Sequence, residues 1–241
     1  MKFGAFIVGT DTGVGKTLVT AALARSFADQ GFDVGVMKPI ETGLLNSFST
    51  RSDAMRLKRA ARSRDPITDI RPYGFRWPLA PLDASRLERR RLDMSSLLRT
   101  YRRLRATHDI LLAEGAGGLY VPISSTLTMA DLIHRMRLSV ILVGRSGLGG
   151  INHALLTLAA LRREKISVLA LLLNPVGPAK SAIARRQERS TVRQLRHSAE
   201  VPVIGPLPYL SRLNRSWEQG ISALARENSI KTLAKTVLAS G

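Results

Sequence analysis

Cysteine is absent from this 241-residue chain, and aromatic residues make up only 5% of it. Without cysteine the chain cannot form disulfides, use a thiol nucleophile or build the common cysteine-containing zinc sites. Its four histidines match no metal-ligand spacing. No apolar run approaches the roughly 20 residues needed to cross a bilayer, and the apolar run after Lys2 lacks a signal-peptide cleavage pattern. We therefore expect a globular protein of the cytoplasm.

Acidic residues are scarce relative to basic ones, with 18 Asp and Glu against 37 Lys and Arg, and the net charge is +19. Such a surplus attracts nucleic acid, anionic lipid or anionic substrates without choosing among them. The basic residues gather at 56–64, 86–105 and 180–196. Aromatic residues are not interleaved there, so a stacking platform for single strands is unsupported. We expect solvated helix faces, no specific nucleic-acid partner and no membrane partner.

Apolar runs alternate with segments of helical pattern along the chain. The apolar runs predict strands at residues 3–8, 33–38, 108–113, 139–143, 166–173 and 201–204. The other segments predict helices at residues 18–24, 52–62, 94–106, 129–135, 151–162, 180–197 and 221–238. Residues 65–85 contain four prolines and are expected to be irregular. We predict one P-loop NTPase-like α/β domain over residues 1–241, a doubly wound, mostly parallel sheet with helices on both faces.

Residues 9–17, GTDTGVGKT, stand between an expected strand and an expected helix, as a phosphate-binding loop does. In such a loop backbone N–H groups hold phosphates, the Lys16 ammonium reaches the outer oxygens and the Thr17 hydroxyl ligates Mg²⁺. The first glycine of the general pattern falls at Thr10, with Gly9 one residue early. A glycine-rich turn without a ligand is the alternative. Residues expected to contact the nucleotide are Gly13, Val14, Gly15, Lys16, Thr17 and Leu18.

Polar side chains follow the ends of several expected strands, where ligands bind in open α/β sheets. Lys38, Glu114 and Asn174 stand at such positions. Glu114 and Asp53 are candidates to complete, with Thr17, the oxygen shell of Mg²⁺. Asp53 is also compatible with a helix cap, and Lys38 with an ordinary surface lysine.

A glycine-rich helix start at Gly149, Gly150, Ile151 and Asn152 offers free N–H groups to an anion such as a carboxylate. A plain helix start with a glycine and an asparagine in its first turn fits these residues equally well.

Six segments in this order resemble dethiobiotin synthetases, and the resemblance covers residues 1 to about 210. They are GTDTGVGKT (9–17), KPIETG (38–43), SDA (52–54), EGAGG (114–118), GLGGINH (147–153) and GPLP (205–208). The resemblance implies an ATP-dependent enzyme that forms dethiobiotin from 7,8-diaminononanoate and CO₂, releasing ADP and phosphate. It also implies ATP and Mg²⁺ as the bound groups and a homodimer with its sites at the interface.

By this resemblance Lys16 and Lys38 stabilise a carbamate and the transferring phosphoryl group, and Thr12 and Thr42 orient the carbamate and amines. The helix start at 149–152 would receive the substrate carboxylate across the subunit boundary. Further substrate contacts implied by the family motifs are Gly117 and Gly118. The residues that resemble its adenine pocket are Asn174, Pro206, Leu207 and Pro208.

Two positions depart from the family pattern. Gly13 stands where some members carry an acidic residue, and Leu82 stands where a histidine is expected after proline. A dimerising ATPase switch of the ParA and MinD type, which binds DNA or membrane, is the alternative function. Those proteins carry an additional, earlier lysine in the phosphate loop, which residues 10–12 lack.

Overall fold

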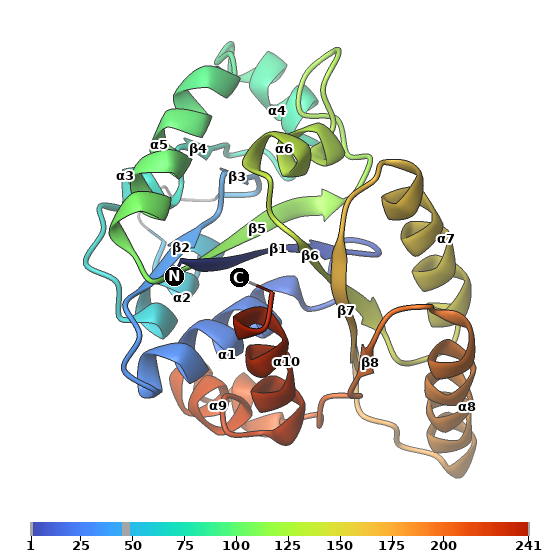
Figure 1. The fold of residues 1–241 in the computed structure, drawn as a ribbon. Coiled ribbons are helices and arrows are strands. Elements are labelled where there is room, and N and C mark those ends of the chain that lie inside the picture. Colours follow the sequence, from blue (N-terminus) through green and yellow to red (C-terminus); the bar gives the residue numbers. More distant parts are fainter. Residues whose placement is uncertain (1, 45–48, 241) are drawn as a thin grey trace.

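The computed structural model describes residues 2–44 and 49–240, which are built around a six-stranded sheet (Figure 1). All pairings are parallel, and the strand order is β2-β5-β1-β6-β7-β8. The strands are β1 (Phe3–Gly9), β2 (Val34–Met37), β5 (Ile110–Gly118), β6 (Val140–Arg145), β7 (Val168–Asn174) and β8 (Val203–Ile204). The predicted parallel α/β sheet is confirmed.

Helices cover both faces of the sheet (Figure 1). Strand β1 shows why both faces are covered: its successive side chains point to opposite faces of the sheet, and the side chains on both faces are apolar. Phe6 and Val8 belong to one buried cluster, Ala5 and Ile7 to the other, and all four are fully buried. One face carries α5 (Met94–Thr107), α6 (Met129–Met136), α7 (Gly150–Arg163) and α8 (Ala182–Ser198). The other carries α1 (Lys16–Asp29), α2 (Asp53–Ala61), α9 (Trp217–Leu224) and α10 (Asn228–Leu238).

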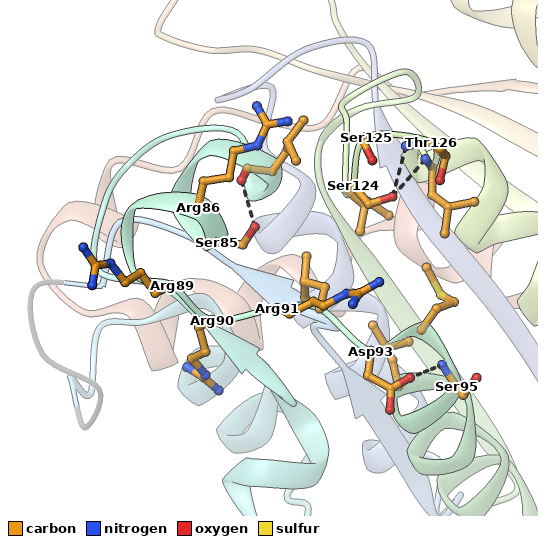
Figure 2. A pocket seen from close by; sticks show the side chains of 16 residues that line it. Ser85, Arg86, Arg89, Arg90, Arg91, Asp93, Ser95, Ser124, Ser125 and Thr126 are labelled. Atoms are coloured by element: carbon orange, nitrogen blue, oxygen red, sulfur yellow. Dashed lines mark hydrogen bonds between the residues drawn. The ribbon is translucent and has the colours of Figure 1, made fainter.

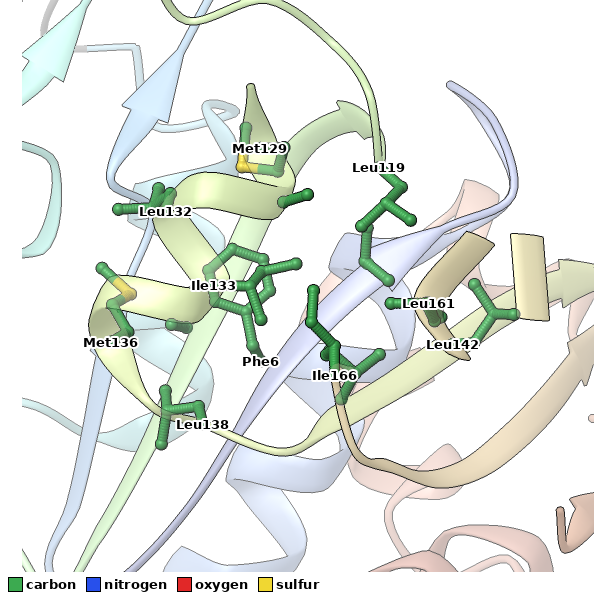
Figure 3. Packing of buried hydrophobic residues seen from close by; sticks show 14 of the residues in the cluster. Phe6, Leu119, Met129, Leu132, Ile133, Met136, Leu138, Leu142, Leu161 and Ile166 are labelled. Atoms are coloured by element: carbon green, nitrogen blue, oxygen red, sulfur yellow. The ribbon is translucent and has the colours of Figure 1, made fainter. Parts of the chain in front are cut away.

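Helix α6 illustrates the packing of the first face. Its Met129, Leu132, Ile133 and Met136 side chains project toward the sheet, where they meet Phe6 (Figure 3). These residues stand at positions i, i+3, i+4 and i+7, which form one stripe of a helix, and the sheet shields this stripe from water. The same cluster continues across β6 to Leu161 of α7.

Residues 65–85, predicted to be irregular, instead contain short elements. These are α3 (Ile67–Ile70), β4 (Tyr73–Gly74), which pairs with β3 (Ile40–Glu41), and α4 (Pro81–Leu87). Two of the prolines start helices: Pro66 is the N-cap residue of α3 and Pro81 opens α4. Proline is well tolerated at a first turn, so these residues mark helix starts and not irregular chain.

Several predicted boundaries are wrong. The first helix, predicted at 18–24, runs from Lys16 to Asp29. The closing helix predicted at 221–238 is two helices, because Glu227 adopts an extended backbone (φ −66°, ψ 143°) between α9 and α10. A 3₁₀ turn, η1 (Ser211–Asn214), precedes them. Strand β5 continues past Ala113 to Gly118, so Glu114 lies inside the strand, paired with Ile7 of β1. Within residues 2–44 and 49–240, every helix is too short or too polar to span a bilayer.

Candidate active site

The phosphate-binding loop follows β1 and ends where α1 begins. Gly15 caps α1 with a left-handed backbone (φ 102°), and a Cβ there would lie 2.2 Å from Nδ2 of Asn174. A Cβ at Gly9 would lie 2.8 Å from the Asp11 carbonyl oxygen and 2.8 Å from Cγ2 of Val14. The tight turn therefore requires glycine at position 9, and this accounts for a loop whose first glycine stands one residue early.

Lys16, in the first turn of α1, is largely buried, and its Nζ donates to the carbonyl oxygen of Asp11 at 2.9 Å. Burial, reinforced by the positive charge of Lys38, lowers the pKa of Lys16 to about 8. The nearby carboxylates do not offset this effect, so a bound anion close to the ammonium of Lys16 would stabilise its charged form.

Lys38 follows β2 and is 4% exposed, so the alternative of an ordinary surface lysine is wrong. Its Nζ lies 2.5 Å from Oε1 of Glu114 and 3.0 Å from Oδ2 of Asp53. Burial acts to lower the pKa of Lys38, but the two carboxylates outweigh it and raise that pKa above its ordinary value. Lys38 is therefore a fixed cation at neutral pH.

Asp53 begins α2, and the helix cap is Ser52, whose Oγ accepts from the Met55 N–H at 3.3 Å. The Asp53 carboxylate is thus directed to Lys38. Burial acts to raise the pKa of Asp53, but the Lys38 charge, hydrogen bonds from Lys38 and Thr17, and the Arg56 charge lower it. Both members of the pair are charged.

Oxygen atoms suited to a magnesium ion meet at this point. Glu114 is fully buried, its Oε1 accepts from Oγ1 of Thr17 at 2.7 Å, and its buried Oε2 has no hydrogen-bond partner in the described part of the chain. A buried carboxylate oxygen without a partner is costly unless a ligand satisfies it. Within residues 2–44 and 49–240, no group of three or more His, Cys, Asp or Glu residues is arranged to hold a metal ion by itself. Two carboxylates and a hydroxyl fit Mg²⁺, which keeps several waters.

These groups surround a cavity of about 370 Å³, here named the phosphate cavity. It brings together eleven of the residues predicted from the sequence: Thr12, Gly13, Gly15, Lys16, Thr17, Leu18, Lys38, Thr42, Asp53, Glu114 and Gly117. The other predicted residues do not line it: Val14, Gly118, 149–152, Asn174 and 206–208.

Four residues of the phosphate cavity were not predicted as site residues: Glu41, Arg56, Ala116 and Trp217. Glu41, on β3, is buried and accepts from the backbone N–H groups of Asp53 and, at 3.4 Å, Ala54. Its Oε2 also lies 3.1 Å from Nη1 of Arg71. Glu41 thus holds the start of α2 against β3, the strand that follows Lys38, by hydrogen bonds. Its position within KPIETG was the available signal, but the motif alone assigns it no partner.

The residues predicted for an adenine pocket lie behind the phosphate loop. Asn174, the last residue of β7, is buried and its Nδ2 donates to the Val14 carbonyl at 2.9 Å. The Leu207 N–H donates to the Leu173 carbonyl at 2.9 Å, which holds residues 206–208 beside the end of β7. Residues 206–208 line a second cavity of about 480 Å³ with Pro175 and Tyr209, the proline-lined cavity.

The predicted anion seat at 149–152 starts α7, outside both cavities. Gly149 is the N-cap with a left-handed backbone (φ 81°), and no side chain caps the helix. A Cβ at Gly150 would lie 2.2 Å from the Arg145 carbonyl oxygen, so the turn itself requires glycine. Both interpretations of this segment, anion seat and plain helix start, are compatible with that geometry.

A larger cavity of about 810 Å³ lies elsewhere, between the 86–95 segment and the 123–127 loop. We name it the arginine-lined cavity after Arg86, Arg89, Arg90 and Arg91. Their guanidinium groups point in different directions and do not converge on one point (Figure 2). Leu82, where the family pattern has histidine, also lines it.

Comparisons with known proteins match most of the chain. The family model described as an AAA domain matches residues 4–216. Proteins named ATP-dependent dethiobiotin synthetase share 46% identity (Thermodesulfovibrio yellowstonii, 89% of this chain and 92% of that one) and 32% identity (Bacillus velezensis, 87% and 88%).

Two solved structures have the same fold. One is a ParA family ATPase from Chlorobium tepidum, with a TM-score of 0.58 at 15% identity, covering 99% of both chains. The other is MinD in its complex with MinC from Aquifex aeolicus, with a TM-score of 0.58 at 15% identity, covering 99% of this chain and 97% of that one. At this identity the likeness concerns the fold alone.

Proposed function

We propose roles for these residues from the premise that this chain belongs to the family of ATP-dependent dethiobiotin synthetases. The activity is ATP-dependent carboxylation and ring closure of 7,8-diaminononanoate with CO₂, which gives dethiobiotin, ADP and phosphate. One observation supports the assignment of the reaction to the phosphate cavity: Lys16, Lys38, Thr17, Asp53 and Glu114 converge there.

The reaction has three bond-forming steps. An amine of the substrate adds to CO₂ and loses a proton, forming a carbamate. The carbamate oxygen then bonds to the γ-phosphorus of ATP while the bond from that phosphorus to the bridging oxygen breaks and ADP leaves. Finally the second amine bonds to the carbamoyl carbon and loses a proton, the carbon–oxygen bond breaks, and phosphate leaves. Negative charge gathers at the carbamate and the transferring phosphoryl group in every step.

In our proposal Lys16 and Lys38 stabilise that charge as cations. Lys38 remains protonated because Asp53 and Glu114 raise its pKa, so it acts neither as a base nor as a nucleophile. Its Nζ is fixed by two carboxylates, and a preorganised cation costs little reorganisation when charge develops. Thr12 and Thr42, on the walls of the cavity, would orient the carbamate and amines, and Gly117, with Gly118 behind it, would let them approach the backbone.

Thr17, Asp53 and Glu114 would hold Mg²⁺. When bound, the ion neutralises phosphate charge. The proposal is supported by the partnerless Glu114 Oε2 and by the Thr17 hydroxyl 2.7 Å from Glu114 Oε1.

The nucleotide base would enter the proline-lined cavity, where Pro206, Leu207 and Pro208 supply backbone groups and Asn174 stands at the boundary with the phosphate loop.

The helix start at 149–152 lies outside the phosphate cavity of its own chain. In a homodimer it would bind the carboxylate of the substrate held in the phosphate cavity of the other copy. We propose the cytoplasm as the location and expect no specific nucleic-acid or membrane partner.

The deciding experiment is ATP turnover by the purified protein. We expect ADP release only when the diamine and bicarbonate are both present, with dethiobiotin formed in equal amount. ATP hydrolysis that responds to DNA or liposomes and ignores the diamine would instead identify a switch of the ParA and MinD type.

A further inference from the structure

Arg56 and Trp217 form a wall of the phosphate cavity that the roles above leave unused. Arg56 lies one turn beyond Asp53 on α2, and Trp217 is the first residue of α9. The Cζ of Arg56 lies 4.3 Å from the centroid of the Trp217 ring. A guanidinium stacked on indole is held in position while the N–H groups at its edge stay available to a ligand.

The charges around the cavity distinguish Arg56 from Lys38. Lys38 is paired with two carboxylates. Arg56 makes no ion pair with any carboxylate in the described ranges, although its charge is close enough to Asp53 to help lower the pKa of that carboxyl. A guanidinium is always charged and carries five donors arranged in a fork that matches phosphate oxygens. As far as the described residues go, the cavity therefore contains a positioned cation without a paired carboxylate.

The chain connects this wall to the proposed base pocket. Helix α9 comes directly after the segment that contains residues 206–208 and η1. Besides the Arg56–Trp217 contact, α9 and α2 are joined by an ion pair in which Nε of Arg59 lies 3.5 Å from Oε1 of Glu218. Arg59 lies one turn beyond Arg56 but does not line the cavity. Arg56 thus lies on the side of the phosphate cavity that α9 forms, and α9 follows in the chain the segment that lines the proposed base pocket.

We propose that Arg56 is an additional nucleotide-binding residue that donates to the phosphate oxygens of ATP, and that Trp217 is the positioning residue that holds it. The proposal rests on the proposed function, since nucleotide phosphate is the anion assigned to this cavity. Substrate carbamate or carboxylate is the competing anion, and the experiment separates the two.

The test measures binding of ATP and of ADP, each with Mg²⁺ and without the diamine, by calorimetry. We expect Arg56→Ala to raise the Kd for both nucleotides about tenfold or more, as loss of a charge-assisted hydrogen bond does. Arg56→Lys keeps the charge but loses the planar stack, and we expect an intermediate Kd. Arg59→Ala is the matched control, because it removes the neighbouring exposed contact to α9, and we expect a Kd within about twofold.

Trp217 supplies an independent readout, because the chain has only one other tryptophan, Trp77. In a Trp77→Phe background, ATP should change the fluorescence of Trp217, and adding Arg56→Ala should remove most of that change. Trp217→Leu should raise the Kd for ATP by several fold while Trp217→Phe, which keeps an aromatic ring, restores most of the affinity. In steady-state assays the KM for ATP should rise in Arg56→Ala while the KM for the diamine stays unchanged.

An unchanged nucleotide Kd in a folded Arg56→Ala variant would overturn the proposal. So would a rise in the diamine KM alone, which would assign Arg56 to the other substrate. Because binding is measured without the diamine, absence of ring closure in the wild-type protein would refute the proposed function and leave the nucleotide result to be judged separately.

Discussion

The phosphate cavity and the arginine-lined cavity are both rich in cations, but they differ in whether those cations converge. In the phosphate cavity each one is fixed, Lys16 on a carbonyl, Lys38 between two carboxylates and Arg56 on an indole ring. In the larger cavity the guanidinium groups diverge (Figure 2).

Arg90 shows how the charges of the larger cavity are used. Its Nη1 donates to the Gly74 carbonyl at 2.9 Å, and its guanidinium lies 5.9 Å and 5.6 Å from the centroids of Tyr73 and Phe75. Arg86 is 64% exposed and its nearest acidic partner, Asp83, is 3.8 Å away. Convergence of fixed groups therefore marks the candidate active site, whereas cavity size and the number of positive residues do not.

The largest effect should follow from removal of one fixed cation of the phosphate cavity. We expect Lys38→Ala or Lys16→Ala to lower kcat for dethiobiotin formation by at least ~10²-fold, because each cation stabilises developing charge in a preorganised site. Arg91→Ala, in the arginine-lined cavity, is the matched control and should leave kcat near that of the wild type. Near-normal turnover by Lys38→Ala would remove Lys38 from the mechanism.

A buried ion pair should also matter more to stability than an exposed one. Glu41→Ala leaves the Arg71 guanidinium and two N–H groups at the start of α2 without this carboxylate, and we expect a loss of about 3 kcal/mol in the free energy of unfolding. Glu200→Ala, which breaks the exposed pair with Arg162, should cost less than about 1 kcal/mol. Denaturant titrations measure both, and equal losses would contradict the expectation.

Of the two cavities, the phosphate cavity is the one whose affinity for anions should change with pH in the alkaline range, because Lys16 titrates there and arginine does not. The pKa of Lys16 is lowered to about 8, so the free protein loses this charge as pH rises through 8, and bound phosphate favours the charged form. Affinity for ADP should fall by up to about tenfold per pH unit above 8, with proton uptake on binding. Calorimetry in buffers of different ionisation enthalpy measures that uptake. No uptake between pH 8 and 9 would show that Lys16 is not the titrating contact.

The smallest effects should follow changes in the arginine-lined cavity. We expect Arg86→Ala with Arg91→Ala to change the free energy of unfolding by no more than about 0.5 kcal/mol for each substitution.

Retention of the protein on DNA should disappear by about physiological ionic strength, as for non-specific attraction to phosphates. Retention that persists in higher salt and depends on these arginines would give this cavity a function of its own.

Sequence patterns predicted the sheet because apolar runs at regular intervals are a local property. They also located the phosphate loop, Lys38 and Glu114, since functional groups at the carboxyl ends of parallel strands gather at one edge. Asp53 was predicted at a helix start, as a candidate ligand of Mg²⁺. The end of β5 was wrong by five residues, because pairing with β1 extends the strand through Glu114 to Gly118. That extension depends on a neighbour in space, which a single segment does not reveal.

Glu41, Arg56 and Trp217 could not be predicted for the same reason. Each gains its place in the site through a partner distant in sequence, as Arg56 does through Trp217, 161 positions along the chain. The split of the closing helix was missed because residues 225–227 contain neither glycine nor proline. The roles of all the predicted site residues in binding and catalysis, including 149–152, Asn174 and 206–208, stay predictions.

The amide that joins Asn174 to the Val14 carbonyl, against a glycine with no room for a side chain, has a consequence for the speed and cost of nucleotide capture. Contact with Asn174 at the end of β7 fixes the conformation of the phosphate loop before a nucleotide binds. Nucleotide binding then requires little loss of conformational entropy in the loop, so more of the interaction energy contributes to affinity.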